Sequence, residues 1–158
     1  MCFLKDLFKK KTEFPVIEQA KGELPSPRVA IDSQKIIYDE ATETLTITGI
    51  KGPVRITSVA NTNSMEPAID AGHTTVCSSN PNYMSTDMIK RGDVIIYNAS
   101  WTQSQIIHAV IETGEDVNGW YCKAQGWHND YPDPEIIRIG QILQVVLITV
   151  WSGMEDEA

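Results

Sequence analysis

Residues 105–124 read QIIHAVIETGEDVNGWYCKA, a pattern typical of a β-hairpin. Residues 105–112 are a β-prone run that is apolar apart from its two ends and His108; a polar turn over 114–119 follows, and mostly apolar residues resume over 120–124. Two β-prone runs that flank a short turn containing glycine are the usual signal for two antiparallel strands. The stretch therefore predicts that a sheet forms the centre of the protein.

The segments on both sides of this hairpin continue the β pattern. Residues 44–48 (TLTIT) alternate strictly between polar and apolar, which predicts a strand with one buried face, paired with residues 35–38 in another hairpin. Short apolar runs predict the remaining strands, over residues 54–59, 74–77, 94–97, 136–139 and 142–150. The fold class is therefore mainly β, with one short helix expected near Met65 or within residues 82–90.

Length and charge limit the classes of protein to consider. The chain has 158 residues, and its 13 Lys and Arg against 21 Asp and Glu give a formal net charge of −8. This length fits one domain, and the acidic balance argues against nucleic acid as a partner, because phosphate binding needs a basic face. We expect a leader and linker over residues 1–27, a β domain over 28–151 and an acidic tail over 152–158.

The leader has an amphipathic pattern, in which Phe3, Leu4, Leu7 and Phe8 fall on one helical face beside several lysines. One interpretation is peripheral membrane contact through residues 1–11. The other is a terminal helix that frays or packs on the domain. No secretory signal is visible, and no run approaches the ~20 apolar residues that span a bilayer. The expected location is cytoplasmic or peripheral to a membrane.

Three cysteines, Cys2, Cys77 and Cys122, form no CxxC pair, which favours reduced thiols, although a Cys77–Cys122 bridge stays open. His73 and Cys77 are four residues apart, but this spacing matches no zinc pattern. On a strand these two residues would lie about 13 Å apart. His128 and Cys122 could also approach one another as metal ligands. We therefore predict no metal and no other cofactor.

Ser64 stands out because of its setting in Asn63-Ser64-Met65-Glu66-Pro67, at the end of an apolar strand. A serine on such a bend can present its hydroxyl to a cleft while nearby N–H groups face a developing oxyanion. A nucleophilic serine also needs a base. His108 lies on a predicted strand beside Ile106 and Val110, where it is either that base or a hydrogen-bonded core residue.

Three blocks of sequence occur in a fixed order. They are residues 63–69 (NSMEPAI), residues 91–97 (RGDVIIY) and residues 106–111 (IIHAVI), and a loop with Gly126 and Asp133 follows them. This order resembles the signal peptidase I family, in its endoplasmic-reticulum and archaeal type. The resemblance covers residues 54–150. It implies hairpins and a coiled, partly closed sheet, a fold shared with SOS-repressor peptidases, and a serine endopeptidase that cuts a peptide or protein substrate.

The resemblance also implies roles for single residues. Ser64 would be the nucleophile and His108 the general base, with Asp133 supporting the histidine and Asp130 as the competing candidate. The oxyanion hole would use the N–H of Ser64 and the hydroxyl of Thr62, which otherwise caps the bend. Asp93 is a further candidate for support, although it more simply sets a turn or pairs with Arg91. Shallow pockets beside the serine imply small residues before the cut.

Two alternatives stay open. Ala109 stands where the family has arginine, and Trp127-His128 replaces an Asp-Asn pair, so a non-catalytic β module that binds a partner is the rival from another class. A self-cleaving repressor-type peptidase shares the Ser-Met-x-Pro element. That type uses a lysine base and cuts at an Ala-Gly or Cys-Gly bond upstream of the serine, whereas Ala71-Gly72 here lies downstream.

Overall fold

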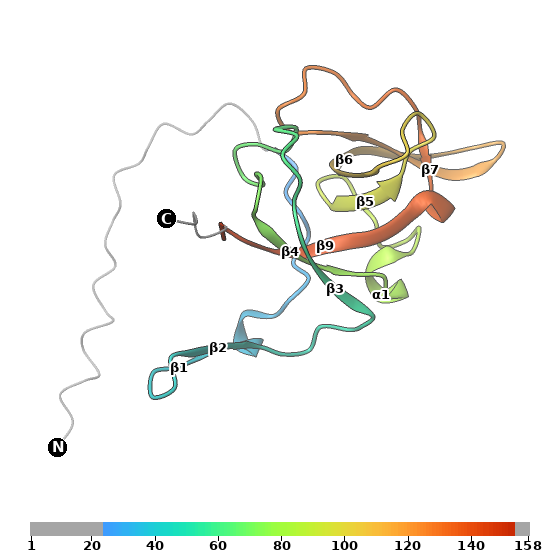
Figure 1. The fold of residues 1–158 in the computed structure, drawn as a ribbon. Coiled ribbons are helices and arrows are strands. Elements are labelled where there is room, and N and C mark those ends of the chain that lie inside the picture. Colours follow the sequence, from blue (N-terminus) through green and yellow to red (C-terminus); the bar gives the residue numbers. More distant parts are fainter. Residues whose placement is uncertain (1–23, 154–158) are drawn as a thin grey trace, which may run out of the picture.

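A computed structural model describes residues 24–153, and these form a mainly β protein (Figure 1). Its elements, in chain order, are η1 (Ser33–Lys35), β1 (Ile36–Asp39), β2 (Thr44–Ile47), β3 (Val54–Ser58), β4 (Thr74–Ser78), α1 (Pro81–Met84), β5 (Val94–Asn98), β6 (Gln105–Asp116), β7 (Gly119–Gln125), β8 (Ile137–Arg138), η2 (Ile139–Gln141) and β9 (Ile142–Val150). The predicted class is confirmed, and the short helix lies at the start of the 82–90 region.

The main sheet has the strand order β3-β4-β9-β5-β6-β7-β8, and every pair of adjacent strands in it is antiparallel. β6 and β7 form the hairpin predicted from residues 105–124. The sheet is not closed, so the expected partial closure is not observed. The reason is that β3 and β8 stand at opposite ends of the order, and each pairs with only one strand of the described chain.

Apolar side chains pack on both faces of the central strands. Successive residues of a strand point to opposite faces, and Val94 pairs with Ala109 whereas Ile95 pairs with His108. Val94 and Ala109 belong to a cluster with Met65, while Ile95 belongs to the larger cluster. His108 therefore lies on the face of the larger core, and Met65 ties the serine segment to the other face.

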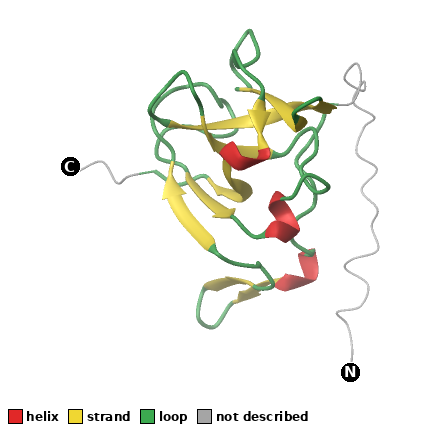
Figure 2. Cartoon of the chain, turned by 90° about the vertical axis from the view of Figure 1, so that its right-hand side faces the viewer, coloured by secondary structure: helices red, strands yellow, loops and turns green. Residues whose placement is uncertain are grey.

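The hairpin of β1 and β2 stands apart from the main sheet, at the bottom of both Figure 1 and Figure 2. Its strands pair as predicted. However, the prediction that residues 44–48 would bury one face is wrong, because the cross-strand pair Tyr38 and Leu45 is 59% and 61% exposed. The alternating pattern indicates a strand correctly, but within residues 24–153 no other strand pairs with this hairpin.

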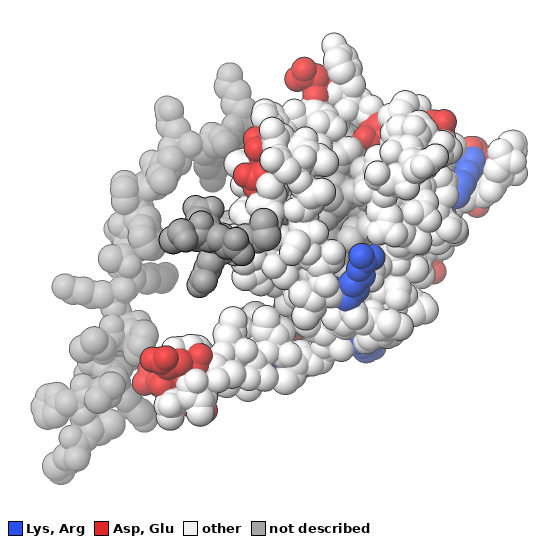
Figure 3. All heavy atoms as spheres, in the orientation of Figure 1, with Lys and Arg blue, Asp and Glu red and all other residues white. Residues whose placement is uncertain are grey.

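Charged side chains are unevenly distributed over the face that Figure 3 shows. Acidic side chains gather at the turn of the hairpin, where residues 39–43 read DEATE. The basic side chains on this face are separated from one another. Much of the visible negative charge is thus held on the projecting hairpin, away from the strands of the main sheet.

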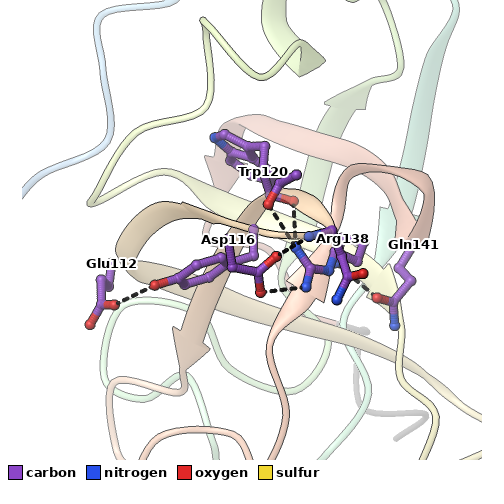
Figure 4. Close-up of polar contacts among 8 residues, drawn as sticks. Glu112, Asp116, Trp120, Arg138 and Gln141 are labelled. Carbon is purple, nitrogen blue, oxygen red and sulfur yellow. Dashed lines mark hydrogen bonds and ion pairs between the residues drawn. The ribbon is translucent and has the colours of Figure 1, made fainter.

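The side chain of Arg138 on β8 joins this short edge strand to the β6–β7 hairpin through polar contacts (Figure 4). Its guanidinium lies 2.7 Å from Asp116 and donates to the carbonyls of Gly119 and Trp120, and it lies over the ring of Tyr121. The hydrogen bond from Arg138 is the main reason that the pKa of Asp116 lies below its ordinary value. These contacts hold the chain just after the loop that carries Asp133.

A buried ion pair joins the start of the described chain to the sheet. The side chain of Asp93 is 2% exposed and lies 3.1 Å from Nη2 of Arg28. Its carboxylate also accepts hydrogen bonds from the backbone N–H groups of Arg28 and Lys90, so Asp93 does set its turn. The other expectation, a pair between Asp93 and Arg91, is not observed, because Arg28 reaches the carboxylate from 65 residues away.

We expect Arg28→Met to lower the free energy of unfolding by about 3–5 kcal/mol, because it leaves the buried carboxylate of Asp93 without a counterion. The matched control is Arg91→Met, at an exposed position, for which a change within about 0.5 kcal/mol is expected. Urea-induced unfolding of the two variants measures both changes. Equal losses in both would contradict the assignment of Arg28 as the partner of Asp93.

Cys77 and Cys122 are both free thiols and both fully buried, so the alternative of a bridge between them is wrong. Burial raises the pKa of Cys77, and it raises the pKa of Cys122 to about 12. A buried neutral thiol is a poor nucleophile. Within residues 24–153, no helix is both long and apolar enough to cross a membrane.

In a Cys2→Ser variant, we expect Ellman's reagent to leave Cys77 and Cys122 unmodified at pH 8 until the protein unfolds. The ordinary thiol pKa is 9.0 and the folded value for Cys122 is about 12, so the folded state holds this proton more tightly. The resulting stabilisation is complete below pH 9 and disappears as the pH rises toward 12. Rapid labelling of the folded protein at pH 8 would contradict this prediction.

Candidate active site

A cleft of about 630 Å³ opens beside the serine segment. Its lining includes residues 57–60, at the end of β3 and just after it, and residues 104–107, at the start of β6. Thr62, Ser64 and His108 line the cleft together. The fold thus brings the two predicted catalytic side chains, which lie 44 positions apart in the sequence, to one open cavity.

The backbone around Ser64 is held from several sides. Asn63 adopts φ 58°, a left-handed conformation that asparagine tolerates better than most residues. The carbonyl of Ser64 accepts a hydrogen bond of 3.0 Å from the N–H of His128. Gly126 approaches the same carbonyl so closely that a Cβ there would lie 2.4 Å from the oxygen. With Met65 buried at 2% exposure, these contacts aim the serine hydroxyl at the cleft.

The hydroxyls of Thr62 and Ser64 lie 3.2 Å apart. Thr62 therefore faces the nucleophile, and both side chains reach the cleft. A hydroxyl at this position can donate to the oxyanion that develops when the serine attacks a carbonyl.

His108 forms a buried pair with Asp133. Its Nδ1 lies 2.8 Å from both carboxylate oxygens of Asp133, and the two side chains are 8% and 6% exposed. β6 supplies the histidine, and the aspartate comes from the loop after β7, where its N–H donates to the carbonyl of Ala124. With the Nδ1 proton directed at the carboxylate, Nε2 is left as the basic nitrogen of the ring.

Tyr97 holds the carboxylate from the other side. Its hydroxyl donates a hydrogen bond of 2.5 Å to Oδ2 of Asp133. Burial, and then this bond to the carboxylate, raise the pKa of Tyr97 well above its ordinary value, so the phenol stays a donor. Two donors, from β5 and β6, therefore fix the orientation of Asp133.

No hydrogen bond joins Ser64 directly to His108 within residues 24–153, where the serine hydroxyl faces Thr62 instead. Hydrogen bonds between catalytic groups are often long without substrate and shorten only in the complex. The two residues nevertheless line the same open cleft, although His108 is 6% exposed and lies on the face of the larger core.

The other two candidates for support lie elsewhere. Within the described chain, Asp130 makes no hydrogen bond or ion pair with His108, because the loop presents Asp133 to the ring. Asp93 is also not a support for the histidine, since its carboxylate forms an ion pair with Arg28 and accepts a hydrogen bond from the N–H of Lys90. Asp133 is therefore the carboxylate at the site.

Two neighbours of the site were not predicted from the sequence. Tyr97 reads only as the end of an apolar strand, although it shares a face with Ile95 and hence with His108. His128 departs from the family pattern, yet its Nδ1 lies 3.2 Å from both the carboxylate of Glu66 and the carbonyl of Asn63. Through these contacts and its N–H, His128 binds the loop after β7 to the serine segment.

We expect Thr62→Val to lower kcat for peptide cleavage by about 10²–10³-fold, because the variant keeps the shape of the side chain but loses an oxyanion donor. Thr57→Val is the matched control, since Thr57 lines the same cleft but does not contact Ser64. Steady-state kinetics on one peptide substrate distinguishes kcat from KM. A loss seen only in KM would contradict the oxyanion role.

Within the described residues, no group of three or more His, Cys, Asp or Glu side chains is arranged to hold a metal ion. His73 is used instead in a local turn, where its Nδ1 accepts from the N–H of Asp70. Comparisons of the chain with protein-family models, curated proteins and solved structures found no match. Its function is therefore inferred from the geometry of the site.

Proposed function

We propose that this protein is a serine endopeptidase that resembles signal peptidase I and cuts peptide bonds by a Ser/His mechanism. One observation carries the proposal: His108, which is paired with Asp133, lines the same open cleft as the adjoining hydroxyls of Ser64 and Thr62. A nucleophile, a base and a group that orients the base are the parts that acyl transfer by serine requires.

The reaction uses these parts in sequence. Nε2 of His108 takes the proton of Ser64 Oγ as the oxygen bonds to the carbonyl carbon of the substrate. The N–H of Ser64 and the hydroxyl of Thr62 stabilise the oxyanion. The C–N bond then breaks as His108 returns the proton to the leaving amine, and water hydrolyses the acyl-enzyme. Asp133 stabilises the imidazolium throughout.

The shape of the cleft supports a peptide substrate. It has a volume of about 630 Å³ and is lined by residues 57–60 and 104–107 as well as by Ser64. Val59, Ile96 and Ile107 supply apolar side chains to the lining. Small, weakly polar residues before the cut fit this lining and agree with the resemblance.

The order of the site residues along the chain supports the same resemblance. An open, antiparallel sheet carries the serine after β3, the histidine on β6 and the aspartate after β7. This order of site residues along the chain follows the three blocks of sequence that resemble signal peptidase I. The signal-peptidase-type fold is accordingly part of the proposal.

A peptide library with mass-spectrometric readout tests the proposed activity. We expect defined cleavage products, and an acyl adduct on the tryptic peptide that contains Ser64 when the reaction is quenched in acid. An adduct on another residue would refute the mechanism. A library that stays intact at high enzyme concentration would favour the non-catalytic binding module instead.

A further inference from the structure

The cleft beside Ser64 carries one positive charge that no carboxylate neutralises. Arg55 is the only Lys, Arg, Asp or Glu among the described residues that line this cleft. Its side chain takes part in none of the ion pairs that the described residues form. The chain has a formal net charge of −8, so the charge of the cleft lining is opposite in sign to that of the whole protein.

The register of β3 directs Arg55 toward the cleft. Arg55 and Thr57 lie two positions apart on this strand and share a face, and both line the cleft. Thr75, which pairs with Thr57 on β4, lines the cleft as well. Ile56, between Arg55 and Thr57, is 69% exposed and does not line the cleft. The strand therefore presents the guanidinium on the same side as the other cleft residues.

Within the described chain, the side chain of Arg55 makes one hydrogen bond, and its acceptor is a neutral group. Nη1 lies 3.4 Å from Oε1 of Gln105, which is longer than most N–H···O bonds. Gln105 begins β6, which does not pair with β3, so the contact connects two separate strands of the lining. A guanidinium has a planar fork of N–H donors that matches a carboxylate. A carboxylate is therefore a better acceptor for Arg55 than the amide of Gln105.

We infer that Arg55 is a specificity-determining residue, which binds an Asp or Glu side chain of the peptide substrate; this inference rests on the proposed function. The substrate carboxylate displaces Oε1 of Gln105 and accepts two parallel hydrogen bonds from the guanidinium. Charge-assisted bonds of this kind are stronger than neutral ones. No described carboxylate in the lining competes for Arg55. The substrate class is thus an acidic peptide.

The acidic residue of the substrate lies away from the bond that is cut. The N–H of Val59 donates to the carbonyl of His73, so the antiparallel pairing that begins in β3 continues to this residue. The four steps from Arg55 to Val59 span about 13 Å at the strand rise of ~3.3 Å per residue. An extended substrate advances by a similar distance per residue. We therefore expect Arg55 to bind a side chain several residues from the cut, beyond the two residues that flank it.

A glutamate scan of one cleaved peptide tests the preference. The parent peptide is one that the protein cuts, with glutamine in place of its acidic residues, and glutamate is then introduced at one position at a time. We expect one position, away from the cut, to raise kcat/KM about tenfold, as one charge-assisted hydrogen bond can. This gain should shrink as the salt concentration rises, because ions screen an exposed charge pair. Equal kcat/KM for all the peptides would overturn the inference.

Charge variants of Arg55 assign the preference to this residue. In Arg55→Gln, the ratio of kcat/KM between the glutamate and glutamine peptides should fall to about one. In Arg55→Glu the preference should reverse, so that a peptide with lysine at the same position is cut faster than the glutamate peptide. Arg91→Gln is the matched control, because Arg91 is exposed and lines a different cavity, and it should keep the original preference. A preference that survives Arg55→Gln would overturn the assignment.

The same assays distinguish this inference from the proposed function. If peptides are cut in a Ser64-dependent reaction at rates that ignore their charge, the inference about Arg55 fails and the peptidase stands. If no peptide is cut, the proposed function fails and the inference fails with it. A preference of the original protein for lysine peptides would also overturn the inference, because a cleft with Arg55 as its only charged side chain among the described lining residues repels them.

Discussion

Ser64→Ala is expected to lower kcat for peptide cleavage by about 10⁶-fold, close to the loss seen when a serine peptidase loses its nucleophile. The variant removes the oxygen that forms the acyl-enzyme. It should leave the fold intact, because the hydroxyl of Ser64 bonds only to Thr62 among the described residues and Met65 still anchors the segment. Single-turnover kinetics measures the loss.

Ser104→Ala is the matched control for this prediction. Ser104 lines the same cleft, and its hydrogen bond to Thr102 uses its backbone N–H and not its hydroxyl. We expect its kcat to stay within a factor of a few. Comparable losses of kcat in the two variants would mean that the loss is not specific to Ser64, and would contradict its assignment as the nucleophile. Cleavage that is retained in Ser64→Ala would likewise exclude Ser64 as the nucleophile.

Asp133→Asn is expected to lower kcat by about 10⁴-fold while the overall geometry is kept. The amide presents either a donor or an uncharged oxygen to Nδ1 of His108, where the carboxylate now lies 2.8 Å away. The ring then loses the tautomer that leaves Nε2 basic, and the imidazolium loses its counter-charge. Asp133 also accepts from Tyr97, so thermal unfolding must be measured alongside the kinetics.

Asp130→Asn is the control that the same loop offers. It makes the same chemical change three residues away, at a carboxylate without contact to His108 among the described residues, and we expect a near-normal kcat. A loss in Asp130→Asn that matches the loss in Asp133→Asn would refute the assignment. The double variant Ser64→Ala/Asp133→Asn should be no slower than Ser64→Ala alone, because the three side chains act as a unit.

The strand pattern was predictable because it depends on neighbours in the sequence. The glycine-containing turn before Trp120 predicts the hairpin of β6 and β7, and that hairpin is present. The same reasoning failed for the burial of residues 44–48. Alternation reports which side chains share a face, but only the rest of the fold decides whether anything packs on that face.

The site divides in the same way. The segment around Ser64 was recognisable as a candidate from its own residues, whereas the role of His108 came from the resemblance, because its strand alone also fits a hydrogen-bonded core residue. The resemblance favoured Asp133 and left Asp130 open, because three residues of loop decide which carboxylate meets the ring, and the structure places Asp133 there. The partner of Asp93 was equally hidden, since Arg28 lies 65 positions away and no local pattern connects the two.

Short-range information in the chain was thus enough for the mainly β class, both hairpins and the candidate Ser64, and the resemblance added His108 and Asp133. The tertiary structure alone brought Asp133 and Tyr97 together around the histidine. The physical reason is range: turns and alternating faces arise within a few residues, whereas ion pairs, buried hydrogen bonds and a shared cleft depend on segments that meet only when the sheet has formed.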